Sequence, residues 1–192
     1  LQQRLQAPRL HVVLPDAEYP IVFSPDETWP ADELKFAAPA TKICLVTDET
    51  VGRLHATRYL QALSPMAQVE LLTVPPGEAS KSWATAGTLL EQMAQLRCTR
   101  NTVVVALGGG VIGDLAGFVA ATYMRGVRLV QIPTTVLAQV DSSVGGKTGV
   151  NLPTGKNLVG SFHQPRLVYV DQSTLATLPD RDRRAGLAEL AL

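Results

Sequence analysis

A strand-like run that passes directly into three glycines constrains this chain most. Residues 102–107 (Thr-Val-Val-Val-Ala-Leu) are apolar or β-branched and uncharged, which is typical of a strand buried on both faces. The glycine motif Gly108-Gly109-Gly110-Val111-Ile112-Gly113 follows, and helical spacing continues from about Gly113 to Met124. Such a turn lets the backbone approach a pyrophosphate, which the helix N-terminus stabilises with unpaired N–H groups and its dipole. The pattern predicts a nucleotide site; a tight turn without a ligand is the alternative.

The other apolar runs alternate with segments of helical period. This alternation predicts an α/β fold, Rossmann-like, with a largely parallel sheet flanked by helices. We expect further strands at residues 42–47, 69–74, 127–132 and 168–170, and further helices at 51–63 and 82–97. Residues 12–36 suggest an antiparallel hairpin that four prolines interrupt.

Composition narrows the classes of function. In the 192 residues, 17 basic and 17 acidic side chains cancel, so nothing favours a nucleic-acid or anionic-membrane surface. No apolar run is long enough to span a bilayer, and residues 1–8 carry no signal-peptide core. Cys44 and Cys98 are too few for a disulfide framework, and Cys44 is expected to be a buried thiol. We therefore expect a cytosolic protein that acts on small molecules.

The nucleotide site departs from the usual dinucleotide pattern. Asp114 follows the last glycine of the motif directly, and Pro133 ends the next strand where a ribose-binding acid is usual. Asp48, at the end of an earlier strand, could bind the ribose from another direction. We therefore predict an atypical nucleotide site.

A second glycine-rich motif, Val144-Gly145-Gly146-Lys147-Thr148, resembles a phosphate-binding P-loop but lacks its first glycine. Asp141 stands at that position, and an acid there would repel a phosphate. A nucleoside triphosphatase is therefore disfavoured.

The surrounding segment, residues 141–156, and its continuation to His163 concentrate polar side chains among five glycines. It is predicted to be a long functional loop folded inward onto the domain, because apolar positions interleave with the polar ones. Lys147 and Lys156 offer phosphate or carboxylate binding, and Asp141 can accept a hydrogen bond from a hydroxyl or an amide. A solvated surface loop is the alternative.

Several isolated polar residues leave two interpretations open. Glu78 and Lys81 follow a strand end and suit either a helix start or a ligand. None of the three histidines forms a zinc-ligand pair. His55 is expected to be a surface or partly buried residue. His163 either hydrogen-bonds within the loop, which is the favoured role, or helps to move a substrate proton. Glu189 is either a capping or solvent residue or a ligand.

Taken in order, several motifs resemble the 3-dehydroquinate synthase family over residues 45–189. They are Gly-Gly-Gly-Val-Ile-Gly-Asp from Gly108, Pro-Thr-Thr from Pro133, Gln-Val-Asp-Ser-Ser-Val-Gly-Gly-Lys-Thr from Gln139, Gly-Lys-Asn from Gly155, Phe-His-Gln-Pro from Phe162, Thr-Leu-Pro from Thr177 and Arg-Ala-Gly-Leu-Ala-Glu from Arg184. The segment from Asp141 to Asn157 is the most specific of them.

The resemblance implies an NAD- and metal-dependent lyase that converts a sugar-acid phosphate, 3-deoxy-D-arabino-heptulosonate 7-phosphate, into 3-dehydroquinate and phosphate in the shikimate pathway. It implies that substrate binding and catalysis involve Arg125, Asp141, Lys147, Lys156 and Asn157. Glu189 becomes the first of three ligands to a divalent metal, usually zinc. The implied NAD contacts are Asp48, Thr50, Glu78, Lys81, Gly109, Gly110, Val111, Ile112, Gly113, Asp114, Thr134, Thr135, Lys147, Lys156, Thr174, Leu175, Ala176 and Thr177.

The resemblance also predicts the domain organisation. Residues 1–181 correspond to the NAD-binding domain and 182–192 to the start of a helical domain that carries two histidine ligands in the family. The family has a lysine three residues after the glutamate ligand, where this chain has Leu192. We therefore expect the chain to be the cofactor half of a homodimeric enzyme, and to be inactive alone.

Three alternatives stay open at this point: another sugar-phosphate cyclase, a metal-dependent polyol dehydrogenase, and a non-catalytic nucleotide-binding module. A dehydrogenase would need no pair of phosphate-binding lysines and would release NADH.

Overall fold

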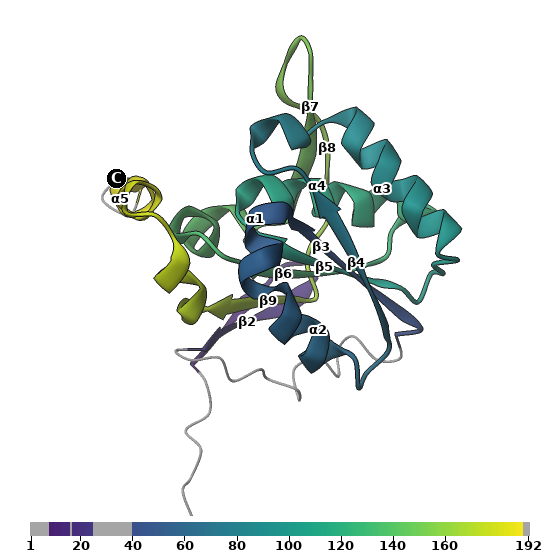
Figure 1. Cartoon of the computed structure of the whole chain (residues 1–192), viewed down its shortest axis with the longest axis horizontal. Helices are drawn as coiled ribbons and strands as arrows, with labels where there is room; N and C mark the ends of the chain where they lie inside the picture. The colour runs from purple at the N-terminus through teal and green to yellow at the C-terminus, as the bar shows by residue number, and fades with distance from the viewer. Residues whose placement is uncertain (1–7, 16, 25–39, 190–192) are drawn as a thin grey trace, which may run out of the picture.

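A seven-stranded sheet forms the centre of the structure, a computed structural model that describes residues 8–15, 17–24 and 40–189 (Figure 1). The strand order is β1-β2-β9-β6-β5-β3-β4, and only β1 and β2 pair antiparallel. This arrangement confirms the predicted parallel sheet. The strands are β1 (Arg9–Val13), β2 (Glu18–Ser24), β3 (Lys42–Asp48), β4 (Gln68–Val74), β5 (Val103–Gly108), β6 (Arg128–Pro133) and β9 (Leu167–Asp171).

Helices cover both faces of the sheet, and the central strand β5 shows why. Its side chains alternate between the faces: Val104 and Ala106 pack in one hydrophobic cluster, and Val103 and Val105 in the other. The first cluster lies under α3 (Trp83–Gln95) and α4 (Gly110–Thr122). The second lies under η2 (Gly52–Ala56) and α2 (Thr57–Leu63), which continue α1 (Glu49–Val51). Burial on both sides explains the uncharged run at this strand.

The chain leaves β3 and β5 toward opposite edges of the sheet. β3 connects to β4 on one side, and β5 connects through α4 to β6 on the other. In parallel sheets such a reversal opens a crevice at the carboxyl ends of the two strands, where ligands usually bind. Asp48 ends β3 and Gly108 ends β5. The fold therefore places Asp48 and the glycine motif at the same crevice.

Helix α4 begins at Gly110, three residues before the predicted start at Gly113. Gly108 therefore ends β5, Gly109 is the N-cap, and Gly110 begins the first helical turn. The helix ends at Thr122, before the predicted Met124, because Met124 and Arg125 have left-handed backbones (φ 51° and 67°). These two residues lie in the short η4 (Tyr123–Arg125).

The prediction of a long loop at residues 141–156 was wrong. After η5 (Ala138–Ser142), the strands β7 (Lys147–Leu152) and β8 (Gly155–Phe162) form an antiparallel hairpin, drawn at the top of Figure 1. Gly149 pairs with Gly160, and a Cβ on Gly160 would lie 2.1 Å from the carbonyl oxygen of Thr148. The glycines thus permit close packing of the two strands. They were predicted to be loop residues because glycine is common in loops. Val150 is buried against α4, as the inward folding predicted, whereas Phe162 is 78% exposed.

The remaining described elements are the short η3 (Glu78–Ser80), η6 (Gln172–Thr177) and α5 (Asp180–Glu189). The predicted hairpin over residues 12–36 is β1 with β2; residues 25–39 lie outside the described part of the chain. Cys44 is buried as predicted, with its Sγ 3.4 Å from that of Cys98. Over the described ranges, every helix is too short or too polar to cross a bilayer.

Candidate functional site

A cavity of about 540 Å³ opens at the carboxyl ends of β3, β5 and β6. We call it the first cavity. It brings together predicted cofactor residues that are far apart in the sequence, as the crevice between β3 and β5 requires. The lining comprises Asp48, Thr50, Val51, Leu54, His55, Pro76, Gly77, Gly109, Gly110, Val111, Ile112, Thr134, Thr135, Thr177, Leu178, Pro179 and Asp182.

The glycine motif forms the floor of this cavity at the N-terminus of α4. Gly109 is the N-cap and offers no side-chain cap, so the first N–H groups of the helix are open to a ligand. A Cβ on Gly110 would lie 3.0 Å from Ser142 Oγ, and one on Gly109 would lie 3.1 Å from Thr135 Cγ2. The turn therefore fits glycine and presents uncapped donors and the positive helix end, which is what a pyrophosphate requires.

Asp48 holds one wall of the first cavity. Its Oδ1 accepts hydrogen bonds from the backbone N–H of Thr50 (2.8 Å) and Val51 (3.0 Å), which fixes the carboxylate at the start of α1. Within the described residues its Oδ2 has no partner, so it can accept from a ribose hydroxyl. This position supports the prediction that Asp48 replaces the acid missing at Pro133.

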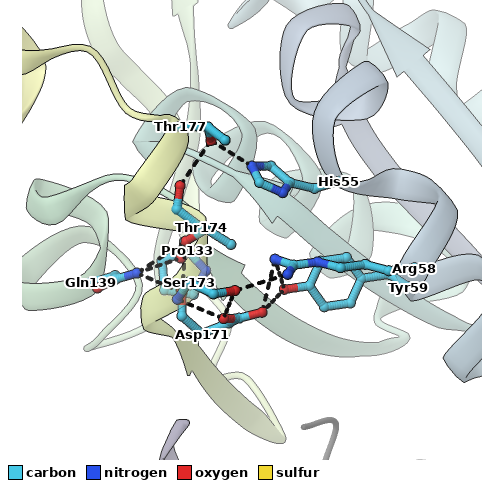
Figure 2. A network of polar contacts seen from close by, with 9 residues as sticks. All are labelled: His55, Arg58, Tyr59, Pro133, Gln139, Asp171, Ser173, Thr174 and Thr177. Carbon is cyan, nitrogen blue, oxygen red and sulfur yellow. Dashed lines mark hydrogen bonds and ion pairs between the residues drawn. The ribbon is translucent and has the colours of Figure 1, made fainter. Parts of the chain in front are cut away.

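The segment η6 and the start of α5 form the opposite wall. Thr177 lines the cavity, and His55 Nε2 lies 2.8 Å from its Oγ1 (Figure 2). His55 is buried more deeply than the surface or partly buried position that was expected, because Thr177 of η6 lies against its ring.

A second cavity of about 430 Å³ lies between η5, α4 and the β7–β8 hairpin. Predicted catalytic residues line it together with small polar residues of the hairpin. The two cavities are neighbours at the first turn of α4, where Gly110 of the first cavity approaches Ser142 of the second. The lining comprises Asp114, Asp141, Ser142, Lys147, Thr148, Gly149, Asn157, Gly160, Ser161 and Phe162.

Lys81 connects three elements at the edge of the second cavity. It is only 6% exposed, and its Nζ donates to Asp114 Oδ2 and, at 2.6 Å, to Asn157 Oδ1. Burial raises the pKa of the Asp114 carboxyl, and the hydrogen bond from Lys81 offsets part of that effect. Ser82 caps α3 by accepting from the backbone N–H of Thr85, so this segment is a helix start, and Lys81 directly precedes the cap.

Glu78 and Lys156 lie further out. Glu78 Oε1 accepts from Asn151 Nδ2 at 2.7 Å, and Lys156 Nζ is 3.9 Å away from the same oxygen. The Lys156 side chain is 73% exposed, and neither Glu78 nor Lys156 lines either cavity.

Other predicted site residues lie apart from both cavities. Arg125 is exposed, Gly113 is buried against Gln131, and residues 174–176 sit within η6. Glu189 ends α5, and no group of three or more His, Cys, Asp or Glu side chains that could hold a metal occurs in the described ranges. The Nε2 of His163 lies 2.8 Å from the Val127 carbonyl oxygen, and this hydrogen bond agrees with the structural role.

Sequence reasoning missed several residues that build the site. Phe162, Ser142 and Ser161 line the second cavity, and Arg58 and Asp171 hold η6 in place. One signal could have identified Asp171, since an acid at the carboxyl end of a parallel strand points toward the ligand edge. Arg58 carries no comparable signal, because its partners are distant in the sequence.

Comparison with known proteins gives a consistent family assignment. Residues 71–185 match the family described as 3-dehydroquinate synthase N-terminal. The 3-dehydroquinate synthase of Nitrosospira multiformis is 53% identical over 150 residues, covering 78% of this chain and 41% of that protein. The Bordetella pertussis protein of the same name is 48% identical over 182 residues, covering 94% and 51%. The chain thus spans about half, or less, of these relatives.

Solved structures of related cyclases agree with this family assignment. A 2-deoxy-scyllo-inosose synthase complexed with carbaglucose-6-phosphate, NAD+ and Co2+ is 31% identical with a TM-score of 0.85, covering 96% of this chain and 51% of that one. A 2-epi-5-epi-valiolone synthase from Streptomyces hygroscopicus subsp. jinggangensis with NAD+ and Zn2+ bound is 31% identical with a TM-score of 0.79, covering 93% and 49%. An iron-containing alcohol dehydrogenase, 15% identical with a TM-score of 0.72 over 86% of this chain and 49% of that one, shares the fold.

Proposed function

Because this chain belongs to the 3-dehydroquinate synthase family, we propose that it forms the NAD-binding part of a 3-dehydroquinate synthase. The proposed reaction converts 3-deoxy-D-arabino-heptulosonate 7-phosphate into 3-dehydroquinate and phosphate. One observation carries the proposal: two neighbouring cavities lie at the first turn of α4, one with an uncapped helix N-terminus and the other with Lys147, Asp141 and Asn157. A cofactor in the first cavity would border a phosphorylated substrate in the second.

NAD fits the first cavity on the geometry of the chain itself. The uncapped N–H groups at Gly110 to Ile112 suit the pyrophosphate, and Asp48 suits a ribose. The hydroxyls of Thr134 and Thr135 lie at the end of β6 on the same wall. When bound, NAD would supply reversible hydride transfer at a substrate carbon; the residues of this chain bind and orient it.

The second cavity supplies the charges that the substrate needs. Lys147 offers a mobile ammonium group for phosphate or carboxylate, and Asn157 offers an amide that Lys81 holds in place. Asp141 can accept a hydrogen bond from a ring hydroxyl. Positive charge near the phosphate stabilises it as it leaves, because the negative charge on the leaving group grows. Lys156, at the outer rim, would attract the substrate.

The metal stays a sequence-based proposal. Glu189 is the residue assigned to it, and the described residues contain no three-ligand set. We therefore derive no step through a metal. Zinc is the expected ion, and a homodimer in the cytosol is the expected form of the complete enzyme.

Two enzyme alternatives are less well supported. The related cyclase structures are about 31% identical to the chain, whereas the curated 3-dehydroquinate synthases are about 50% identical. The alcohol dehydrogenase likeness, at 15% identity, supports the fold alone. A purely nucleotide-binding module would not require the charged second cavity.

Binding of NAD+ to the 192-residue chain tests the first half of the proposal. Calorimetry should give one saturable site, and Gly110→Val should remove it because its side chain would collide with Ser142 and fill the phosphate position. Gly87→Val is the matched control, since a Cβ at Gly87 meets no atom within 4 Å. Equal binding by the two variants would contradict the assigned site.

A fusion tests the second half. The chain joined to the remaining half of the Nitrosospira multiformis relative should release phosphate from the heptulosonate phosphate without accumulating NADH. We expect Lys147→Ala to reduce kcat/KM by about 100-fold or more. The 192-residue chain alone should release none. Stoichiometric NADH formation from a simple alcohol would instead favour a polyol dehydrogenase.

A further inference from the structure

A buried polar network connects η6 to the helical segment η2–α2 (Figure 2). At its base lies Asp171, which is 1% exposed at the end of β9. Its Oδ2 accepts from Tyr59 OH (2.7 Å) and pairs with Arg58 (2.9 Å). Its Oδ1 accepts from the backbone N–H (2.9 Å) and the hydroxyl (2.6 Å) of Ser173. The carboxylate is thus fully engaged and caps the start of η6.

Arg58 binds the same end of η6 twice. One guanidinium nitrogen donates to Ser173 Oγ at 2.9 Å, and the other pairs with Asp171. The guanidinium also stacks over the Tyr59 ring, 4.8 Å from its centroid. Burial and the nearby Asp171 raise the pKa of Tyr59, which keeps its hydroxyl protonated as a donor.

His55 holds the other end of η6. Thr177 Oγ1 donates its single hydrogen to the Thr174 carbonyl oxygen at 3.0 Å, so it must accept from His55 Nε2 at 2.8 Å. The ring of His55 therefore carries a hydrogen on Nε2. His55 and Arg58 are three residues apart, so they lie on the same helix face and reach the two ends of η6.

A third contact ties η6 to the second cavity. Gln139 Nε2 lies within hydrogen-bond distance of the carbonyl oxygens of Pro133 (3.2 Å) and Asp171 (3.3 Å), and of Thr174 Oγ1 (3.4 Å). Gln139 belongs to η5, which also carries Asp141 and Ser142 of the second cavity. The wall of the first cavity is thus connected to both the helix η2–α2 and the second cavity.

We propose that Arg58 and His55 are positioning residues that hold η6 as the wall of the first cavity and thereby slow the dissociation of a bound dinucleotide. The proposal rests on the proposed function for the identity of that ligand. Arg58 acts from behind the wall, since neither it nor Asp171 lines the cavity, whereas His55 acts at the rim through Thr177. Without these contacts, η6 keeps its internal 3-10 bonds, the Asp171 cap and the contacts of Gln139 and Arg183, but the hydrogen bonds of Arg58 and His55 that tie it to η2–α2 are lost.

The test uses the 192-residue chain with Arg58→Met, Arg58→Lys and a control, Arg53→Met. Arg53 is exposed on the same helical segment, and within the described part of the chain it donates only to the Glu49 carbonyl oxygen, at 3.3 Å. We expect Arg58→Met to raise the NAD+ dissociation rate about tenfold, Arg58→Lys to recover part of the loss, and Arg53→Met to leave it unchanged. Stopped-flow displacement measures the rate at a temperature where circular dichroism shows each variant folded.

Two measurements without ligand separate the network from the proposed function. Hydrogen exchange at the Ser173 and Leu178 amides should accelerate in Arg58→Met. The 15N shifts of the His55 ring should report a hydrogen on Nε2 in the wild type and a mixture of tautomers in Thr177→Val. If the wild type binds no NAD+, these two measurements still establish or refute that Arg58 and His55 hold η6 in place. Faster exchange with an unchanged dissociation rate in folded Arg58→Met, or a His55 hydrogen on Nδ1 alone, would overturn the inference.

Discussion

Two buried ion pairs stand at the edges of the two cavities, and their environments differ. In the pair of Arg58 with Asp171, the acid side chain is 2% exposed and lines neither cavity. In the pair of Lys81 with Asp114, the acid side chain is 22% exposed and lines the second cavity. The first carboxylate receives four contacts from protein groups, while the second receives its hydrogen bond from Lys81 alone among the described residues.

The difference is between a charged group that is fully bound within the protein and one that can still bind a ligand. Every oxygen of Asp171 is engaged, so the group can hold η6 but cannot bind anything else. Lys81 uses two of its three donors, on Asp114 and Asn157, and keeps one for a ligand. One ion pair is therefore fully engaged by protein groups, and the other leaves a donor open to a ligand.

The largest loss of stability is expected from removing Asp171, whose two carboxylate oxygens are both engaged. Asp171→Ala leaves the Arg58 charge, the Tyr59 hydroxyl and the η6 cap without their partner, which should cost about 3–5 kcal/mol of unfolding free energy. Urea denaturation followed by circular dichroism measures it. Glu91→Ala, on the exposed side of α3, should change stability by less than about 0.5 kcal/mol. A similar small loss for Asp171→Ala would remove the contrast between the two pairs.

A smaller loss is expected at the second pair. Lys81→Met removes two hydrogen bonds, but water reaches the partly exposed Asp114 carboxylate and solvates it. We expect about 1–2 kcal/mol from the same denaturation experiment. The variant should nonetheless lose more phosphate-releasing activity in the fusion enzyme than Arg58→Met does. If Arg58→Met lost more activity than Lys81→Met, the proposal that the Lys81 pair serves the reaction would be contradicted.

The pH dependence of stability sharpens the comparison further. Since burial raises the pKa of Asp114 above its ordinary value of 3.8, the folded protein binds this proton more tightly than the unfolded chain. The contribution of Asp114 to the unfolding free energy is therefore highest below pH 3.8. It falls as the pH rises through the raised pKa of the folded state. Asp114→Asn should remove this part of the pH dependence of the urea midpoint. Lys81→Met should raise the pKa of Asp114 further, as 13C titration of its carboxyl can show.

The smallest effect is expected at the surface. Lys156 and Glu78 are 3.9 Å apart with side chains 73% and 46% exposed, so Lys156→Ala should cost at most about 0.5 kcal/mol of stability. Any effect should vanish at high salt. A larger loss would show that exposure does not rank these three pairs.

The local pattern predicted the parts of the site that depend on backbone alone. The uncharged run before Gly108 identified the buried central strand, and the glycines identified the turn into α4. Asp48, at the predicted strand end, lines the first cavity, because carboxyl ends of parallel strands meet there. The hairpin at residues 147–162 was missed, since its glycines serve close contact between strands that a sequence does not show to be neighbours.

The sequence by itself determined the alternation of strands and helices, the two-sided burial of β5 and the glycine turn from β5 into α4, because each arises from residues that are near one another in the chain. Only the tertiary structure decided which polar groups meet. Asp171 and Tyr59 are 112 positions apart, and Lys81 and Asn157 are 76 apart. Their hydrogen bonds depend on the order of strands in the sheet, and residue types alone do not specify that order.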